Sequence, residues 1–245
     1  MLAYLKFELR RMYREPRLLV LTIAMPVILF LALSPSITEQ AKNPQDAKDT
    51  LAYLMVAWAA YGALIGTFSS GVGVSVERAA GWLRQLRITP LPPPIVVVCK
   101  AIACSLVAVP AVAMLSVIGI AKGVEFGGAN LALLLVLVMW LGSIPFALVG
   151  LAVGFVLPPT LAQPASFLVS FSLAFAGGIF IPVNAMPATM QSVVRWTPSY
   201  RFNQNGVDIL QHHAQSAASW AIIAGWALVF AALAALAYRR SAATK

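Results

Sequence analysis

Charged residues are scarce in this sequence: they make up only 10% of its 245 residues, whereas 60% are hydrophobic. In a soluble globular domain about a quarter of the residues is charged. Several apolar stretches also approach the roughly 20 residues that a helix needs to cross a bilayer. The composition therefore excludes a soluble globular protein and predicts a chain embedded in a membrane.

Catalytic and metal-binding patterns are absent as well. The two cysteines, Cys99 and Cys104, fall five residues apart in one predicted helix, which is too wide for a disulfide and matches no metal pattern, so both are interpreted as packing residues. The sequence contains no G-x-x-x-x-G-K-[ST] phosphate cradle, no H-E-x-x-H and no G-x-S-x-G. We expect no catalytic residue and no metal site. Any uphill transport must take its energy from another chain.

The apolar stretches predict an all-α polytopic membrane protein with one transmembrane domain over residues 1–245. The predicted spans are 18–36, 51–76, 92–121, 131–157, 161–183 and 219–238. The segments 1–17, 77–100 and 239–245 carry twelve Lys and Arg against three acidic residues, while the other side carries five against five. This asymmetry predicts that both termini are cytoplasmic. The basic excess is interpreted as a topology signal and an attraction to anionic lipid, not as a nucleic-acid site.

Two charged features flank the spans. Residues 1–17 predict an interfacial amphipathic helix that Pro16 ends, although the same residues would also serve as a simple basic flank. Lys100 lies two turns into span three. We interpret it as a side chain that extends to the cytoplasmic surface, which is less costly than an ion site inside the membrane.

A short amphipathic helix is predicted after span two, over residues 77–89. At helical spacing one face is apolar, and the other is polar and suited to a soluble partner. The apolar face comprises Ala79, Trp82, Leu83 and Leu86, and the polar face Glu77, Arg78, Gly81, Arg84 and Gln85.

The segment 184–213 is too apolar for a solvated loop and too rich in proline for a span. We expect short helices that dip back into the outer leaflet, because non-helical backbone at membrane depth needs a protein cover. The pair His212 and His213 is interpreted as part of a solvated face, since adjacent helical residues point in different directions. The small-xxx-small pairs Gly62/Gly66 and Gly150/Gly154 are expected to pack within the subunit.

Taken in order, these motifs resemble those of a known family. The chain has Arg-Glu-Pro before span one and E-R-x-x-G-x-L-x-x-L-x-x-T-P after span two. It then has a Lys ten residues beyond that proline and F-x-P-x-x-x-M-P…P-x-Y after span five. This order resembles the membrane subunit of type-two ATP-binding cassette (ABC) exporters, the drug, lipid and polysaccharide export permeases, over nearly the whole chain.

The resemblance implies three groups of functional residues. A coupling helix over 77–89, which docks into the ATPase subunit, would comprise Glu77, Arg78, Gly81, Leu83, Leu86 and Pro90. An elbow helix over 1–17, which also touches that subunit, would comprise Arg10, Arg11, Arg14, Glu15 and Pro16. An external gate of re-entrant helices would comprise Pro182, Met186, Pro187, Pro198 and Tyr200. Two departures from the family pattern are Ala79, where an acidic residue is common, and the polar run at 201–205.

The function implied is that of a permease subunit in an ATP-driven exporter of the bacterial plasma membrane. Two copies of a separate ATPase, which bind ATP and Mg²⁺, would serve two membrane subunits, identical or related. The substrate would be hydrophobic or amphipathic: drug-like, lipid or glycolipid. One alternative is a membrane scaffold or sensor-associated protein without transport activity. The other is a proton-coupled secondary transporter.

Overall fold

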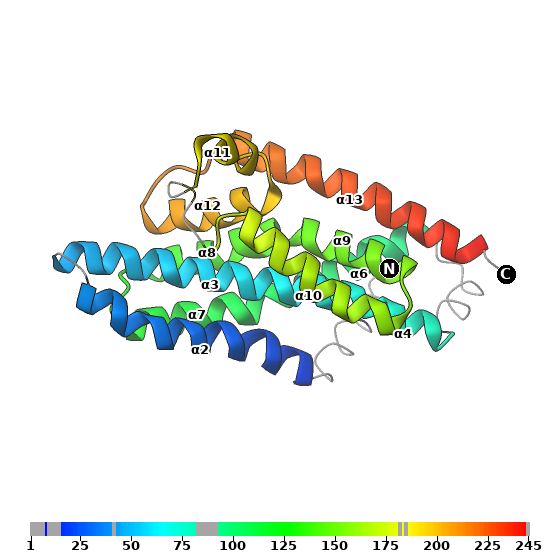
Figure 1. The fold of residues 1–245 in the computed structure, drawn as a ribbon, viewed down its shortest axis with the longest axis horizontal. Coiled ribbons are helices and arrows are strands. Elements are labelled where there is room, and N and C mark those ends of the chain that lie inside the picture. The colour runs from blue at the N-terminus through cyan, green and yellow to red at the C-terminus, as the bar shows by residue number, and fades with distance from the viewer. Residues whose placement is uncertain are drawn as a thin grey trace.

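Long helices form almost the whole described part of the chain. The computed structural model describes residues 8, 16–40, 43–81, 93–180, 183 and 186–243. Every regular element in these residues is a helix, and the long helices lie side by side along the long axis of the molecule (Figure 1). The predicted all-α class is confirmed for this part of the chain. The helices are α2 (Pro16–Gln40), α3 (Pro44–Val72), α4 (Val74–Ala79), α6 (Pro93–Ser105), α7 (Ala108–Ala121), α8 (Ala129–Gly142), α9 (Ile144–Val156), α10 (Pro159–Ala176), α11 (Ala188–Val194), α12 (Pro198–Leu210) and α13 (Ala217–Ala243).

The helices fall where the sequence places the six spans, but the count of six remains a prediction. Four segments, 44–79, 95–121, 129–156 and 217–241, are long and apolar enough to cross a membrane, and they correspond to spans two, three, four and six. Helix α2 lies at span one, where a shorter apolar helix covers residues 22–36, and α10 lies at span five. By their length and composition these helices indicate a multi-pass membrane protein.

Spans three and four are each interrupted near the middle. Helix α6 ends at Ser105 and α7 begins at Ala108, while Ser143 separates α8 from α9. A proline follows each interruption closely, Pro110 in the first turn of α7 and Pro145 in that of α9, and proline removes a helical N–H donor. The indole N–H of Trp140 donates to the Ser105 hydroxyl at 3.1 Å. The two interruptions therefore lie beside one another.

Helix α3 is the central helix of the bundle, and glycines let its neighbours approach closely. It contacts α2, α7, α9, α10 and α12. A Cβ on Gly150 of α9 would overlap the backbone carbonyl of Phe68 in α3, and one on Gly154 would lie 2.9 Å from the carbonyl oxygen of Val72. The predicted packing of these small residues within the subunit is confirmed.

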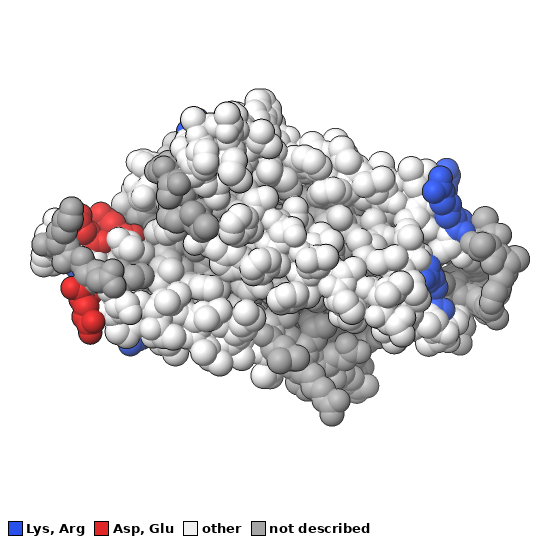
Figure 2. All heavy atoms as spheres, in the orientation of Figure 1, with Lys and Arg blue, Asp and Glu red and all other residues white. Residues whose placement is uncertain are grey.

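On one face of the molecule, the charged side chains of the described residues gather at the two ends of the bundle (Figure 2). On the face in Figure 2, acidic side chains gather at the end where α3 begins, and basic side chains lie at the end where α13 finishes. The band between them is almost free of charge. This distribution fits helices whose middle thirds face lipid and whose ends face water.

Several predicted site residues lie outside the described residues. They are Arg10, Arg11, Arg14, Glu15, Leu83, Leu86, Pro90 and Pro182. Pro16 is the first residue of α2, a position that proline favours because its missing N–H has no helical partner there.

Candidate functional site

The end of span two departs from the predicted surface helix. Glu77 and Arg78 belong to α4, which continues almost directly from α3 and ends at Ala79. Gly81 then adopts a φ of +79°, and no atom of the described residues lies within 4 Å of the position of its missing Cβ. A left-handed residue ends a right-handed helix. The prediction of one helix from 77 to 89 is therefore wrong at its start, and the chain turns at Gly81 before entering residues 82–92.

Lys100 lies at the centre of a buried ion cluster. Its ammonium is 2.6 Å from a carboxylate oxygen of Glu77 and 2.9 Å from one of Glu8. The Lys100 side chain is only 2% exposed, and those of Glu8 and Glu77 are 6% and 10% exposed. The prediction that Lys100 extends to the surface is wrong, because two carboxylates meet it inside the protein. The cluster joins the N-terminal segment, the end of span two and span three.

Arg78 binds the end of span four. Its guanidinium donates to the backbone carbonyls of Phe155 and Leu157, the latter at 2.8 Å, with longer contacts of 3.4 Å to Val156. These carbonyls belong to the last turn of α9 and its cap, where no further helical N–H is available. A cation also interacts favourably with the negative end of the helix dipole. Arg78 therefore caps α9.

Glu77 and Arg78 are the first two residues of the predicted polar face, and both are directed towards other parts of this chain. Both side chains are only half-exposed or less, and their charged atoms bind this chain. A buried charge that loses its partner typically costs about 3–5 kcal/mol. The arrangement consequently resists separation of span two from spans three and four at this end of the bundle.

At the opposite end, the predicted outer segment does form short helices. Pro187 precedes the first residue of α11, and Pro198 is the first residue of α12. The hydroxyl of Thr197 accepts from the backbone N–H of Tyr200 at 3.3 Å, and the carbonyl of Met186 accepts from the side-chain amide of Gln191 at 2.9 Å. The prolines therefore begin helices, where their missing N–H is harmless. Whether these helices re-enter a membrane stays a prediction.

The unexpected polar run at 201–205 has a structural explanation. Phe202, Asn203 and Asn205 are buried, and Phe202 packs edge-on against Phe146 with ring centroids 5.3 Å apart. The Asn205 side chain accepts from the Ser219 hydroxyl at 2.6 Å, and its backbone carbonyl accepts from Gln215 at 3.1 Å. These bonds connect α12 to the start of α13.

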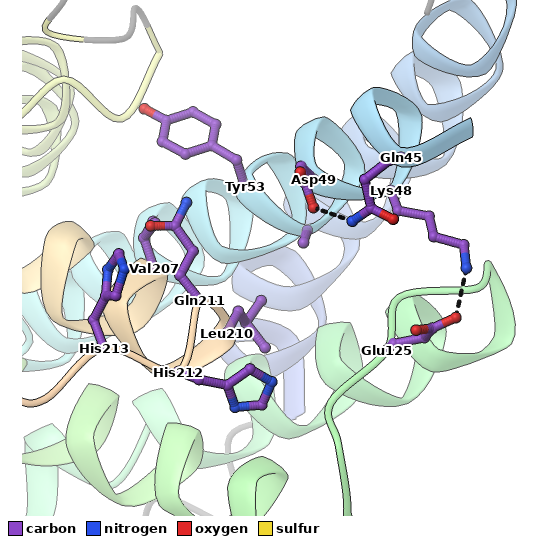
Figure 3. Close-up of a pocket in the computed structure, with 11 residues that line it drawn as sticks. Gln45, Lys48, Asp49, Tyr53, Glu125, Val207, Leu210, Gln211, His212 and His213 are labelled. Carbon is purple, nitrogen blue, oxygen red and sulfur yellow. Dashed lines mark hydrogen bonds and ion pairs between the residues drawn. The ribbon is translucent and has the colours of Figure 1, made fainter. Parts of the chain in front are cut away.

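A polar pocket of about 560 Å³ opens at the same end of the bundle, between α3, the loop after α7 and the end of α12 (Figure 3). At its rim the Lys48 ammonium donates to Glu125 at 2.6 Å. This hydrogen bond, together with the positive charge of Lys48, lowers the pKa of the Glu125 carboxyl. The imidazoles of His212 and His213 point in different directions. Among the described residues no group of three or more potential ligands could hold a metal ion.

The contact between Glu8 and Lys100 was not predicted from the sequence. A signal was present: an ammonium two turns inside an apolar helix needs a buried carboxylate, and Glu77 and Glu8 are acidic residues of the predicted cytoplasmic segments. The sequence did not reveal that these two segments converge on one side of span three.

Two comparisons with known proteins found matches over most of the chain. Residues 28–236 match the family described as "ABC-2 family transporter protein". The chain is also similar to a Bacillus subtilis protein named "Putative transport permease YvfS", with 23% identity over 205 residues, which cover 83% of this chain and 82% of that protein.

Proposed function

The chain belongs to the ABC-2 transporter family of membrane permeases, and we propose that it is the membrane-spanning subunit of an ATP-driven exporter. A separate ABC ATPase binds and hydrolyses ATP with Mg²⁺, and two copies of it serve two membrane subunits, identical or related. The substrate is a hydrophobic or amphipathic molecule: drug-like, lipid or glycolipid.

The observation that carries this proposal is the anchoring of the end of span two. The chain leaves span two through Glu77 and Arg78, which bind spans three and four, and then turns at Gly81. Of the six predicted docking residues, Glu77 and Arg78 bind within this chain. An ATPase docked on the other four, Gly81, Leu83, Leu86 and Pro90, would act on the whole helical bundle through that end. Nucleotide would then bias a two-state element, which is the physical requirement for driving transport from a distance.

The orientation follows from the distribution of charge. The end of the bundle that carries Arg78 and Arg239 faces the cytoplasm of a bacterial cell, with both termini and the elbow segment on that side. Helices α11 and α12 then lie outside, where Met186, Pro187, Pro198 and Tyr200 belong to an external gate, together with Pro182.

A proton-coupled transporter fits the structure less well. Among the described residues the buried charged groups are Glu8 and Lys100, and they bind each other. Proton relays need carboxylates or imidazoles along a path through the bundle. A passive scaffold would lack the ATPase partner and the transport activity of an exporter, so these two properties distinguish it from one.

The test is co-purification followed by transport. The tagged chain is extracted from its native membranes in mild detergent, and a bound subunit with a phosphate-binding loop is sought by mass spectrometry. Inside-out vesicles are then given a fluorescent amphipathic cation. We expect uptake that requires ATP and survives an uncoupler of the proton gradient. Uptake that needs the gradient and no ATP would support the secondary transporter, and the absence of both an ATPase and uptake would support the scaffold.

A further inference from the structure

Three chain segments far apart in sequence meet at one ammonium group. Lys100 of α6 binds Glu77, 23 residues away at the end of α4, and Glu8, 92 residues away in the N-terminal segment. We infer that Lys100 is a positioning residue in an ionic joint, made of Glu8, Glu77 and Lys100, that transmits movement of residues 82–92 to the membrane spans. This inference rests on the proposed function and adds to it the route by which force enters the bundle.

The ionic joint lies close in the chain to residues 82–92, so a movement of those residues would reach it before the rest of the bundle. Gly81 has a left-handed backbone, with a φ of +79°, and it ends the helical path that α4 follows. The last charged residues before this turn are anchored: Glu77 is held by Lys100, and Arg78 is held by the carbonyls that end α9. A load on residues 82–92 therefore passes to spans three and four through charged hydrogen bonds.

Burial makes the hydrogen bonds of Lys100 to Glu8 and Glu77 suitable for transmitting movement to the membrane spans. Solvent screening weakens an exposed ion pair, whereas a charged hydrogen bond shielded from water is electrostatically stronger. The chain offers a direct contrast at its other end, where Lys48 and Glu125 also lie 2.6 Å apart but have side chains 48% and 75% exposed. That pair has the same chemistry and the same distance without the burial.

The ionic joint would transmit movement, whereas a staple, meaning a contact that only stabilises the fold, would not. The two differ in the substitutions that they tolerate. Well-packed hydrophobic side chains of similar volume often stabilise a protein as well as a buried ion cluster does. A neutral variant, Glu8→Met/Glu77→Met/Lys100→Met, would therefore preserve a contact that only stabilises the fold, but it would remove the directional hydrogen bonds. The variant Lys100→Arg keeps a cation that can reach both carboxylates, and it should preserve the joint.

The test measures whether nucleotide bound by the ATPase is felt at the outer end of this chain. A reporter cysteine is introduced by Thr189→Cys, which is exposed on α11, whereas the native Cys99 and Cys104 are buried. The assembled transporter in lipid nanodiscs is treated with a soluble maleimide, with and without ATP and vanadate. We expect nucleotide to change the labelling rate by about fivefold or more, the lower end of ordinary allosteric coupling.

In the neutral variant we expect this response to disappear while the ATPase subunit still co-purifies in the wild-type ratio. The response should persist in Lys100→Arg and in the control variant Lys48→Met/Glu125→Gln. If the neutral variant does not assemble, Glu77→Gln alone, which keeps the bond between Glu8 and Lys100, should weaken the response.

Three results would overturn the inference. The first is a full response in the neutral variant or in Glu77→Gln, which would make the cluster a staple. The second is loss of the ATPase subunit from Glu77→Gln, which would make Glu77 a docking residue. The third is a wild-type protein with bound ATPase but no response to nucleotide. Failure of the proposed function is a separate result, because then no ATPase co-purifies with the wild-type chain.

Discussion

The contact between Arg78 and the end of α9 leads to a quantitative prediction. Replacing Arg78→Met keeps much of the side-chain volume but removes the donors to the carbonyls of Phe155 and Leu157. Net contributions of about 1 kcal/mol for each of two partly exposed hydrogen bonds give about 2 kcal/mol. The lost interaction with the helix dipole adds about 0.5 kcal/mol. The free energy of unfolding should therefore fall by about 2–3 kcal/mol.

For a chain of this size, that loss corresponds to a decrease in Tm of about 4–12 °C. The protein supplies its own reporter, because the free thiols of Cys99 and Cys104 are buried and become reactive towards a fluorogenic maleimide on unfolding. Arg78→Lys should fall between the wild type and Arg78→Met, since an ammonium lacks the planar fork that reaches two carbonyls.

The matched control is Arg239→Met, an exposed arginine at the same end of the bundle. It should change Tm by about 1 °C or less, as surface substitutions usually do. Equal transition temperatures for Arg78→Met and Arg239→Met would refute the assignment of Arg78 as the cap of α9.

Three further predictions concern packing, the outer end and topology. Gly150→Ala should destabilise the protein by about 1–3 kcal/mol because its Cβ meets the backbone of α3. The control Gly225→Ala should be neutral or stabilising by up to about 1 kcal/mol, because no atom of the described residues lies near the added Cβ. Similar shifts in Tm for both variants would contradict the close packing. Asn205→Ala should cost about 1–2 kcal/mol because a buried bond to the start of α13 is lost, and an unchanged Tm would show that this bond contributes nothing. Gln45→Cys should react with an impermeant thiol reagent outside intact cells and Ala80→Cys only after the membrane is opened; labelling of Ala80→Cys from outside would reverse the proposed orientation.

Local sequence features were sufficient to place the long apolar helices. An apolar stretch of about 20 residues has few alternatives to a helix in a membrane, because every backbone polar group must find its partner within the segment. The helices consequently lie at all six predicted positions, and Pro187 and Pro198 stand at the starts of short helices within the predicted outer segment. The close approach of Gly150 to α3 also followed from side-chain size.

The contacts of charged and polar side chains were not predictable in the same way. Hydropathy indicated that Lys100 lies in an apolar helix, but it did not reveal that Glu8 and Glu77 converge on it. Likewise the amphipathic pattern of 77–89 suggested a polar face for a partner, whereas Arg78 instead caps a helix 77 residues further along the chain.

The physical reason is the range of the interactions involved. Helix formation and membrane insertion depend on neighbours within about a turn and on the summed hydropathy of one segment, which the sequence itself contains. The choice of partner for a buried charge depends on which helices lie side by side, and many arrangements of six helices satisfy the same hydropathy pattern. Sequence alone therefore determined that this chain is a helical membrane protein, and only the tertiary structure decided that Glu8, Glu77 and Lys100 form one buried cluster.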